Sequence, residues 1–233
     1  MLLKGRRNLA LLEAGCGSFS HINLEPFSRI IGIDIEQEQL ELNRTLQEKI
    51  LGDLQTYPLP REAFDVVVCW YVIEHLPNPE QALQNMFQAL KPDGLLVLTF
   101  PHLFSFKGVA TKFTPHWFHR LAYWAMRFKG KIFPTVFRLS ILPTRLISAA
   151  EEHGFSVAYY RSFEDQLTKA MRTRLWPVRA IFATVNTLAR IVSFGKCRSL
   201  YEDNCELILR KESRPAVKKS GKANVPIFAN EVA

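Results

Sequence analysis

The sequence predicts an α/β protein with a doubly wound, mostly parallel sheet of the seven-stranded, Rossmann-like type, carrying an aromatic and basic lid insertion. Two observations lead to this class. Short apolar runs alternate with helical patterns from residue 8 to residue 100, and the 233 residues, 48% hydrophobic and 22% charged, are enough for one large globular core. Strands that alternate with helices form right-handed βαβ units, so helices are expected on both faces of the sheet.

The first elements are two apolar runs at residues 8–14 and 29–35, each with an acidic residue near its end, and both are expected as buried parallel strands. Leucines among charges predict a helix over 36–49. Three consecutive valines mark residues 64–70 as the clearest strand, and residues 78–90 have the one-sided apolar spacing of a helix.

The remaining elements resume after a turn at residues 91–94. A buried strand is expected over 94–100, a helix over 142–153, a strand over 155–160 and a last strand over 205–210. Residues 166–194 have a helical pattern that we expect to be broken or bent at Pro177.

These elements fit one domain over residues 1–212. It contains a lid insertion at 102–138, where aromatic and basic residues interrupt the pattern, and a basic amphipathic helical insertion at 161–204. Residues 213–233 mix Lys, Pro, Ser and Ala with few apolar anchors and are expected to be disordered.

The cysteines and the apolar runs of the sequence indicate the cellular compartment. The four cysteines have neither close pairing nor metal-ligand spacing, and no apolar run approaches the roughly 20 residues of a membrane span, so we expect a cytoplasmic protein. Residues 1–100 have a net charge of −5 and residues 101–233 a net charge of +13. A basic half attracts nucleic acid, anionic lipid or an acidic substrate, and charge alone does not choose among them.

The central motif is a strand that ends in Glu-x-Gly-x-Gly, with Glu13, Gly15 and Gly17, followed 17 residues later by Asp34 at the end of the second strand. Glycines at such a turn let the backbone approach a ligand, and an acid on the neighbouring strand can accept both ribose hydroxyls. This pattern indicates a nucleoside-containing cofactor; the alternative is a tight turn that uses glycine for steric reasons only.

Three more motifs follow in order: Leu-Gly-Asp-Leu at 51–54, Phe-Asp-Val-Val-Val-Cys-Trp at 64–70 leading into Val-Ile-Glu-His-Leu at 72–76, and Leu-Lys-Pro-Asp-Gly at 90–94. Together with the glycine motif, this order resembles the class I S-adenosylmethionine-dependent methyltransferases. The Glu-His-Leu-Pro-x-Pro run resembles small-molecule members such as the quinone-pathway enzymes. The resemblance is close over residues 9–101 and loose over 139–160.

The resemblance implies S-adenosylmethionine as the cofactor. Glu13 would hold its ammonium group, Asp34 its ribose and Asp53 its adenine amine. The implied cofactor-binding residues are Glu13, Gly15, Cys16, Gly17, Asp34, Asp53, Leu54, Cys69 and Trp70. The alternatives left open are a helix cap or surface carboxylate for Asp53 and a core thiol for Cys69.

Methyl transfer requires mainly alignment and exclusion of water. His75, beside Glu74, is the predicted base or acceptor-orienting residue, and the alternative is that both residues cap a helix–loop junction. Where some relatives have the first Glu of a metal-binding run, this chain has Tyr71, so no metal is expected; a site that joins Glu74 to the insertion histidines is disfavoured.

The insertion follows the strand after which this fold builds its acceptor site, so a substrate lid is expected. The predicted substrate contacts are Tyr71, His102, His116, Trp117 and His119. Aromatic residues interleaved with cations also suit stacking on nucleic-acid bases, but no RNA-binding module accompanies them, and nucleic-acid binding is disfavoured.

Apolar positions among arginines over residues 176–194 suit peripheral contact with an anionic membrane on the cytoplasmic side; packing on the sheet or on a second subunit is slightly favoured.

Two features depart from the family pattern. Phe19 stands where a small residue is usual, and only about eight residues precede the first strand, so the site is open, covered by a partner, or the start is truncated. We predict methyl transfer to a small or lipid-linked acceptor, preferably on oxygen. The alternatives are an RNA methyltransferase and a non-catalytic module that binds a membrane or a partner. The sequence does not predict an oligomeric state.

Overall fold

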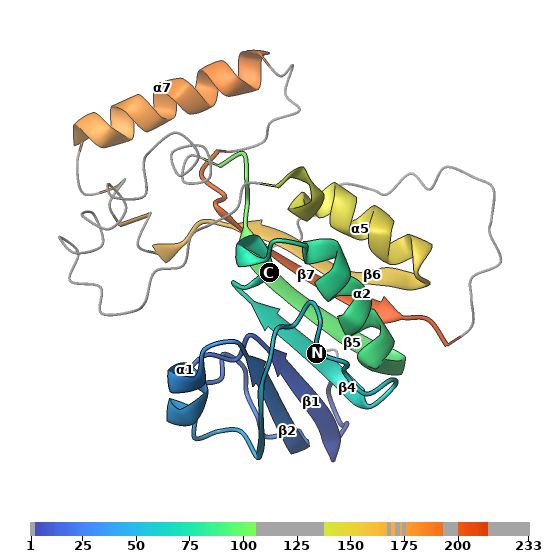
Figure 1. Ribbon diagram of the computed structural model, residues 1–233. Helices are drawn as coiled ribbons and strands as arrows, with labels where there is room; N and C mark the ends of the chain where they lie inside the picture. Colours follow the sequence, from blue (N-terminus) through green and yellow to red (C-terminus); the bar gives the residue numbers. More distant parts are fainter. Residues whose placement is uncertain are drawn as a thin grey trace.

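The computed structural model describes residues 3–105, 138–166, 169–170, 173, 176–192 and 200–213. Seven strands form one sheet in the order β3-β2-β1-β4-β5-β7-β6, and β7 runs antiparallel to both of its neighbours (Figure 1). The predicted fold class, a mostly parallel seven-stranded sheet with flanking helices, is confirmed.

The parallel half of the sheet holds its first four strands: β1 (Leu9–Ala14), β2 (Phe27–Asp34), β3 (Glu48–Leu51) and β4 (Phe64–Trp70). β1 is buried along its whole length because β2 and β4 pair with it on either side. Its last residues therefore lie between two strand ends, and Glu13 is in register with Gly32 and Val68.

The second half holds β5 (Leu90–Pro101), β6 (Phe155–Phe163) and β7 (Asn204–Lys211). Because β7 is antiparallel, its first residues lie beside the last residues of β5, with Asn204 opposite Pro101. Residues about 100 positions apart in the chain thus meet at the same edge of the sheet.

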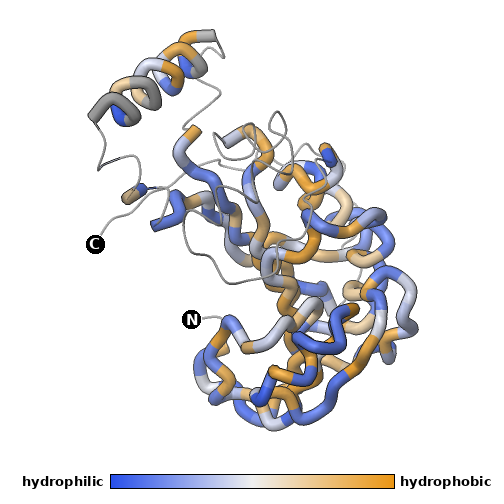
Figure 2. Tube along the Cα trace, turned by 60° about the vertical axis from the view of Figure 1, so that its left-hand side comes forward, coloured by the Kyte–Doolittle hydropathy of each residue, from blue (hydrophilic) through white to orange (hydrophobic). Residues whose placement is uncertain are grey.

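The α-helices with assigned bounds are α1 (Gln37–Leu42), α2 (Pro79–Ala89), α5 (Pro143–Glu152) and α7 (Trp176–Val192), with 3-10 turns η1 (Ile73–His75) and η2 (Leu139–Ile141). α2 and α5 pack on one face against strand residues such as Leu12 and Leu98. Leu40 of α1 packs on the other face with Leu11 and Val66, so both faces are covered. Figure 2 shows hydrophobic residues gathered along the strands between these layers.

Two element predictions are wrong in extent. The helix expected over 36–49 ends at Leu42, and the edge strand β3 occupies Glu48–Leu51. β3 pairs only with β2 and three of its four residues are exposed, so it has no apolar pattern that would reveal it. β5 begins at Leu90, because residues 91–94 form an irregularity within the strand and not a turn before it.

The other expectations after residue 100 agree in order. Gly154, at φ +80°, follows α5, and Pro177 lies in the first turn of α7. Most of the expected lid, residues 106–137, and most of the expected tail, residues 214–233, lie outside the described residues.

Candidate cofactor and acceptor site

The glycine loop after β1 is tied to the end of β2. The backbone N–H groups of Gly15 and Cys16 both donate to the carbonyl of Ile33, at 2.8 and 3.2 Å. Gly15 and Gly17 have φ values of +74° and +53°, which side chains disfavour. A Cβ atom on Gly15 would lie 2.3 Å from Val72 Cγ2, so only glycine lets the loop pass against the segment after β4.

Asp34, the last residue of β2, holds this loop from the neighbouring strand. Its Oδ2 accepts the N–H of Gly17 at 2.8 Å and its Oδ1 accepts the N–H of Glu36 at 2.9 Å. Each oxygen keeps a further lone pair with which to accept a hydroxyl. The next side chain, Ile35, is 67% exposed and offers an apolar surface beside the carboxylate that the sequence analysis did not identify.

Asn43 is a second residue that sequence reasoning missed. Its side chain is fully buried, and its Nδ2 donates to the carbonyls of Cys16 at 3.3 Å and Gly17 at 3.2 Å. Its Oδ1 accepts the N–H of Thr45 at 3.1 Å. Asn43 was missed because a helix was expected over the whole of 36–49. Its position as the residue that ends α1 was the signal that could have identified it. Asn43 therefore fixes the carbonyl side of the loop.

Glu13 lies at the carboxyl end of β1 and is 4% exposed. Burial raises the pKa of its carboxyl group, and the hydroxyl of Ser20 donates to Oε1. Oε2 is buried and has no hydrogen-bond partner among the described residues. A buried carboxylate oxygen of this kind calls for a donor or cation from a ligand.

The 51–54 motif adjoins Asp34 through the backbone, since the N–H of Gly52 donates to the carbonyl of Asp34 at 2.9 Å. The Asp53 carboxylate accepts the N–H of Gln55 at 2.8 Å and its side-chain amide at 2.9 Å. Asp53 thus stabilises its own turn, and Leu54 is buried in the core. Its predicted contact with adenine stays a prediction.

Two predicted cofactor residues, Cys16 and Cys69, point their side chains into the core, and only their backbone is available to a ligand. Burial and the charge of Asp34 raise the pKa of the Cys16 thiol to about 12, and burial raises the pKa of the Cys69 thiol further. Both thiols are therefore protonated near neutral pH and are not nucleophiles.

An aromatic group borders the loop at the end of β4. The ring of His21 stacks on Trp70 with 5.5 Å between centroids and 5° between planes, and Phe19 contacts His21 at 4.6 Å. Phe19, which stands where the family usually has a small residue, is 58% exposed. Its ring therefore belongs to this surface aromatic group and does not pack in the core. His21 was missed, although an aromatic-rich stretch directly after the glycine motif was visible in the sequence.

Glu74 and His75 lie together in η1, with His75 Nε2 3.8 Å from Glu74 Oε1. Glu74 is buried and His75 is half-buried. The N–H of His75 donates to the carbonyl of Val72, the residue that meets Gly15. The pair is therefore linked through Val72 to the glycine loop, and its role at the site stays a prediction.

Tyr71, a predicted substrate contact, has an unusual backbone. Its φ is +54°, a conformation that bulky residues rarely adopt, and its N–H donates to the carbonyl of Thr99 at 2.8 Å. Burial, with the nearby charges of Asp165, Glu74 and Asp203, raises the pKa of its hydroxyl. The Tyr71 hydroxyl therefore stays protonated near neutral pH.

Further polar atoms gather where β5 ends and β7 begins. The N–H of His102 donates to the carbonyl of Asp203 at 2.8 Å, and burial lowers the pKa of the His102 ring. Three buried atoms have no hydrogen-bond partner among the described residues: Thr99 Oγ1, His102 Nδ1 and Asn204 Oδ1. The other three predicted substrate contacts lie outside the residues described: His116, Trp117 and His119.

Comparison with known proteins agrees with this geometry. The model of a methyltransferase domain family matches residues 12–98. The chain is 33% identical over 101 residues to a probable S-adenosylmethionine-dependent methyltransferase of Mycolicibacterium smegmatis, and 31% identical over 103 residues to a ubiquinone biosynthesis O-methyltransferase of Haemophilus ducreyi. These alignments cover 41% and 38% of this chain, and 39% and 44% of the relatives, so the chain spans less than half of their length.

The crystal structure of an S-adenosylmethionine-dependent methyltransferase from Mesorhizobium loti superposes with a TM-score of 0.57 at 15% identity, covering 90% of this chain and 94% of that one. The sheet is thus that of a known fold. Residues 12–98 match a methyltransferase domain, and one relative over this region is a probable S-adenosylmethionine-dependent methyltransferase. The resemblance inferred from the sequence is confirmed, and it implies S-adenosylmethionine as the cofactor.

The methyltransferase domain fits this cofactor in charge and in space. The open acceptor position at Glu13 suits an ammonium group, and the remaining lone pairs of Asp34 suit ribose hydroxyls. Apart from Gly17 itself and its two neighbours in the chain, no described residue has an atom within 4 Å of the position of a Cβ on Gly17, so the loop leaves open space there. Glu13, Gly17 and Asp34 are the residues that would hold the cofactor.

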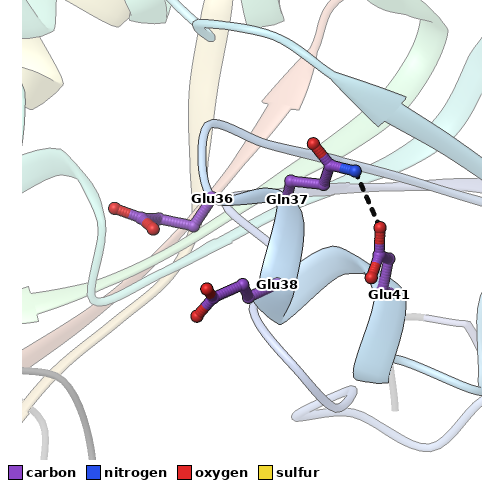
Figure 3. Close-up of a pocket in the computed structure, with 4 residues that line it drawn as sticks. All are labelled: Glu36, Gln37, Glu38 and Glu41. Atoms are coloured by element: carbon purple, nitrogen blue, oxygen red, sulfur yellow. Dashed lines mark hydrogen bonds between the residues drawn. The ribbon is translucent and has the colours of Figure 1, made fainter.

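A hollow beside the methyltransferase site is a different feature (Figure 3). It is lined by Glu36, Gln37, Glu38 and Glu41 at the start of α1, where Gln37 Nε2 donates to Glu41 Oε1 at 2.8 Å. Its lining is acidic and includes no predicted site residue. Among the described residues, no three His, Cys, Asp or Glu side chains are grouped to hold a metal ion.

Proposed function

We propose that this protein transfers a methyl group from S-adenosylmethionine to the oxygen of a small or lipid-linked acceptor. The observation that carries the proposal is the 2.8 Å hydrogen bond from Gly17 N to Asp34 Oδ2. It joins the glycine loop to the acid at the end of the neighbouring strand, so that both can contact one nucleoside.

In this proposal the cofactor supplies an electrophilic methyl group on a sulfonium. Glu13 holds the ammonium group with the oxygen that Ser20 leaves open, and Asp34 accepts the ribose hydroxyls. Asn43 keeps the loop carbonyls turned away from the ligand by donating to them. The His21–Trp70 stack excludes water at the methionine end of the site.

The acceptor site is proposed at the ends of β4, β5 and β7. Hydrogen-bond acceptors gather there, including Asp165 and Asp203 near the Tyr71 hydroxyl and the open Oδ1 of Asn204. Such a set suits a substrate that donates hydrogen bonds, as hydroxyl groups do. The Haemophilus ducreyi relative, named as an O-methyltransferase of ubiquinone biosynthesis, supports oxygen and a lipid-linked acceptor.

His75 is the proposed base. A hydroxyl that gains a methyl group must lose its proton, and His75 can take it while Glu74, 3.8 Å away, stabilises the imidazolium that forms. A His75→Ala variant should therefore lose about 10²–10⁴-fold in kcat, the range for general bases, while its affinity for S-adenosylmethionine stays within about threefold.

Calorimetric titration with S-adenosylmethionine tests the site directly. Asp34→Ala should weaken binding by about 100-fold or more, because two charge-assisted hydrogen bonds are lost, at about 1.5–3 kcal/mol each. Glu38→Ala, in the nearby acidic hollow, is the matched control and should bind as the unsubstituted protein does. Equal affinity in Asp34→Ala would reject the ribose assignment, and no heat up to millimolar cofactor would favour a non-catalytic module.

A further inference from the structure

Helix α7 is chemically distinct from the rest of the structure. Its 17 residues include no Asp or Glu and two arginines, Arg179 and Arg190. Both ribbon and tube views show it separated from the sheet and from helices α2 and α5 (Figures 1 and 2). It belongs to the half of the chain that has a net charge of +13.

Apolar side chains of α7 are exposed where their surroundings are described. Val185 is 39% exposed and Leu188 is 54% exposed, and their spacing of three residues places them on one side of the helix. No α7 side chain whose exposure is described is buried. A helix of this length gains most of its stability by burying an apolar face, so this side calls for an apolar surface beyond the described fold.

Two polar side chains of α7 form hydrogen bonds within the helix, which lowers the cost of contact with an apolar surface. The hydroxyl of Thr184 donates to the carbonyl of Ala180 at 3.0 Å, and that of Thr187 donates to the carbonyl of Ala183 at 2.9 Å. Hydroxyls that are satisfied within the helix cost less to remove from water than unpaired ones. The remaining charged groups, Arg179 and Arg190, are exposed and lie three turns apart on a shared side.

Length and charge identify the surface. At 1.5 Å per residue, α7 is about 25 Å long, shorter than the roughly 30 Å hydrocarbon core of a bilayer. None of the helices that the structure describes is long and apolar enough to cross a membrane. A helix with an apolar side, only positive charges and no acids has the composition of helices that lie in the plane of an anionic membrane surface.

We propose that α7 attaches this protein to the surface of an anionic lipid bilayer, with Val185 and Leu188 toward the acyl chains and Arg179 and Arg190 at the head groups. Attachment through α7 is independent of methyl transfer. If both proposals hold, attachment brings the site to lipid-linked acceptors.

Co-sedimentation of the full chain with vesicles tests the proposal. Vesicles of phosphatidylcholine with phosphatidylserine should bind the protein, those of phosphatidylcholine alone should bind it weakly, and high salt should reduce binding. Arg179→Gln with Arg190→Gln should weaken binding about 30-fold, since each arginine near an anionic surface is worth about fivefold. Leu188→Glu should weaken it at least as much, because it places a negative charge on the apolar side.

Matched control variants distinguish a specific effect of α7 from a general effect of positive charge on vesicle binding. Arg44→Gln with Arg145→Gln removes two exposed arginines elsewhere, and Leu42→Glu changes an exposed leucine on α1. These variants should retain vesicle binding within about threefold, because their residues lie outside the proposed contact. All variants should melt at the temperature of the unsubstituted protein.

Two results would overturn the proposal: no binding to anionic vesicles, or equal binding by the α7 variants and the unsubstituted protein. In the first case, loss of a dimer in Leu188→Glu would assign the apolar side of α7 to a second copy of the chain. An RNA oligonucleotide that binds through Arg179 and Arg190 while vesicles do not would assign the helix to nucleic acid. Calorimetry with S-adenosylmethionine tests the proposed methyl transfer and not membrane attachment. A failure to bind the cofactor would therefore leave the vesicle result valid.

Discussion

The two halves of the sheet's carboxyl edge satisfy their polar groups differently. At the ends of β1 and β2, Asp34 accepts two backbone N–H groups and Asn43 donates to two loop carbonyls. Where β5 ends and β7 begins, Thr99 Oγ1, His102 Nδ1 and Asn204 Oδ1 are buried and have no partner within the described part of the chain. The first half leaves one such atom, Glu13 Oε2, beside a loop whose other polar groups are bonded; the second half leaves three.

The difference follows from chain connectivity. The groups on the cofactor side lie between residues 13 and 53, so short loops between adjacent parallel strands fix them. The groups on the acceptor side come from residues 71 to 204 and meet only because β7 inserts beside β5. The first half is therefore preorganised by local connections, whereas the second depends on the meeting of distant segments.

The largest effect is expected in the glycine loop. Gly15→Ala should lower the free energy of unfolding by about 2–4 kcal/mol, because φ is +74° and the added Cβ meets Val72 at 2.3 Å. Gly17→Ala is the matched control: it has a similar φ but open space, so the loss should be about 1 kcal/mol. Urea unfolding measures both.

Replacing Val72 with alanine in the Gly15→Ala background should recover about 1–2 kcal/mol of that loss, since part of it is overpacking. Equal losses for Gly15→Ala and Gly17→Ala would contradict the close approach of the loop to Val72.

Asn43→Ala should lower the free energy of unfolding by about 1–3 kcal/mol, because the carbonyls of Cys16 and Gly17 lose a buried donor. The cofactor half then loosens, and affinity for S-adenosylmethionine should fall about tenfold in calorimetry. Asn23→Ala, an exposed asparagine, serves as the control. An unchanged affinity in Asn43→Ala would mean that the loop holds its shape without this residue.

Glu13 should make cofactor binding depend on pH. Burial raises its pKa, so the carboxyl is protonated at low pH and ionises as the pH rises through that raised value. Only the ionised form pairs with an ammonium group, so affinity should increase as pH rises towards 7. Glu13→Gln should bind about tenfold more weakly at pH 7 and show a flat profile. A parallel pH dependence in both proteins would reject the ammonium assignment.

The smallest effect is expected on the acceptor half. Thr99→Val removes a buried hydroxyl that has no partner among the described residues, so the free energy of unfolding should stay within about 0.5 kcal/mol or increase. Thermal unfolding measures it. A loss above about 1.5 kcal/mol would show that the hydroxyl is satisfied in the folded protein, and the contrast between the halves would disappear.

Local pattern was sufficient for the buried strands of the first half of the fold. The valines of β4 and the apolar run of β1 are buried strands because both faces of a parallel sheet are covered, which leaves a continuous apolar signature. β3 was not predicted, because an exposed edge strand has no such continuous apolar pattern. The positions of Glu13, Gly15 and Asp34 followed from their motifs, whereas the contacts of Asn43 and His21 did not, since neither belongs to a motif.

The fold class, the strand that carries Glu13 and the pairing of a glycine turn with Asp34 could be inferred from local patterns, because these depend on residues near one another in the chain. The folded chain was needed to show that Cys16 and Cys69 face the core, that Asn43 holds the loop, and that Asp165 and Asp203 lie near Tyr71. Those outcomes depend on which face of a strand is buried and on which distant segments meet. Packing sets both, and no short stretch of residues encodes them.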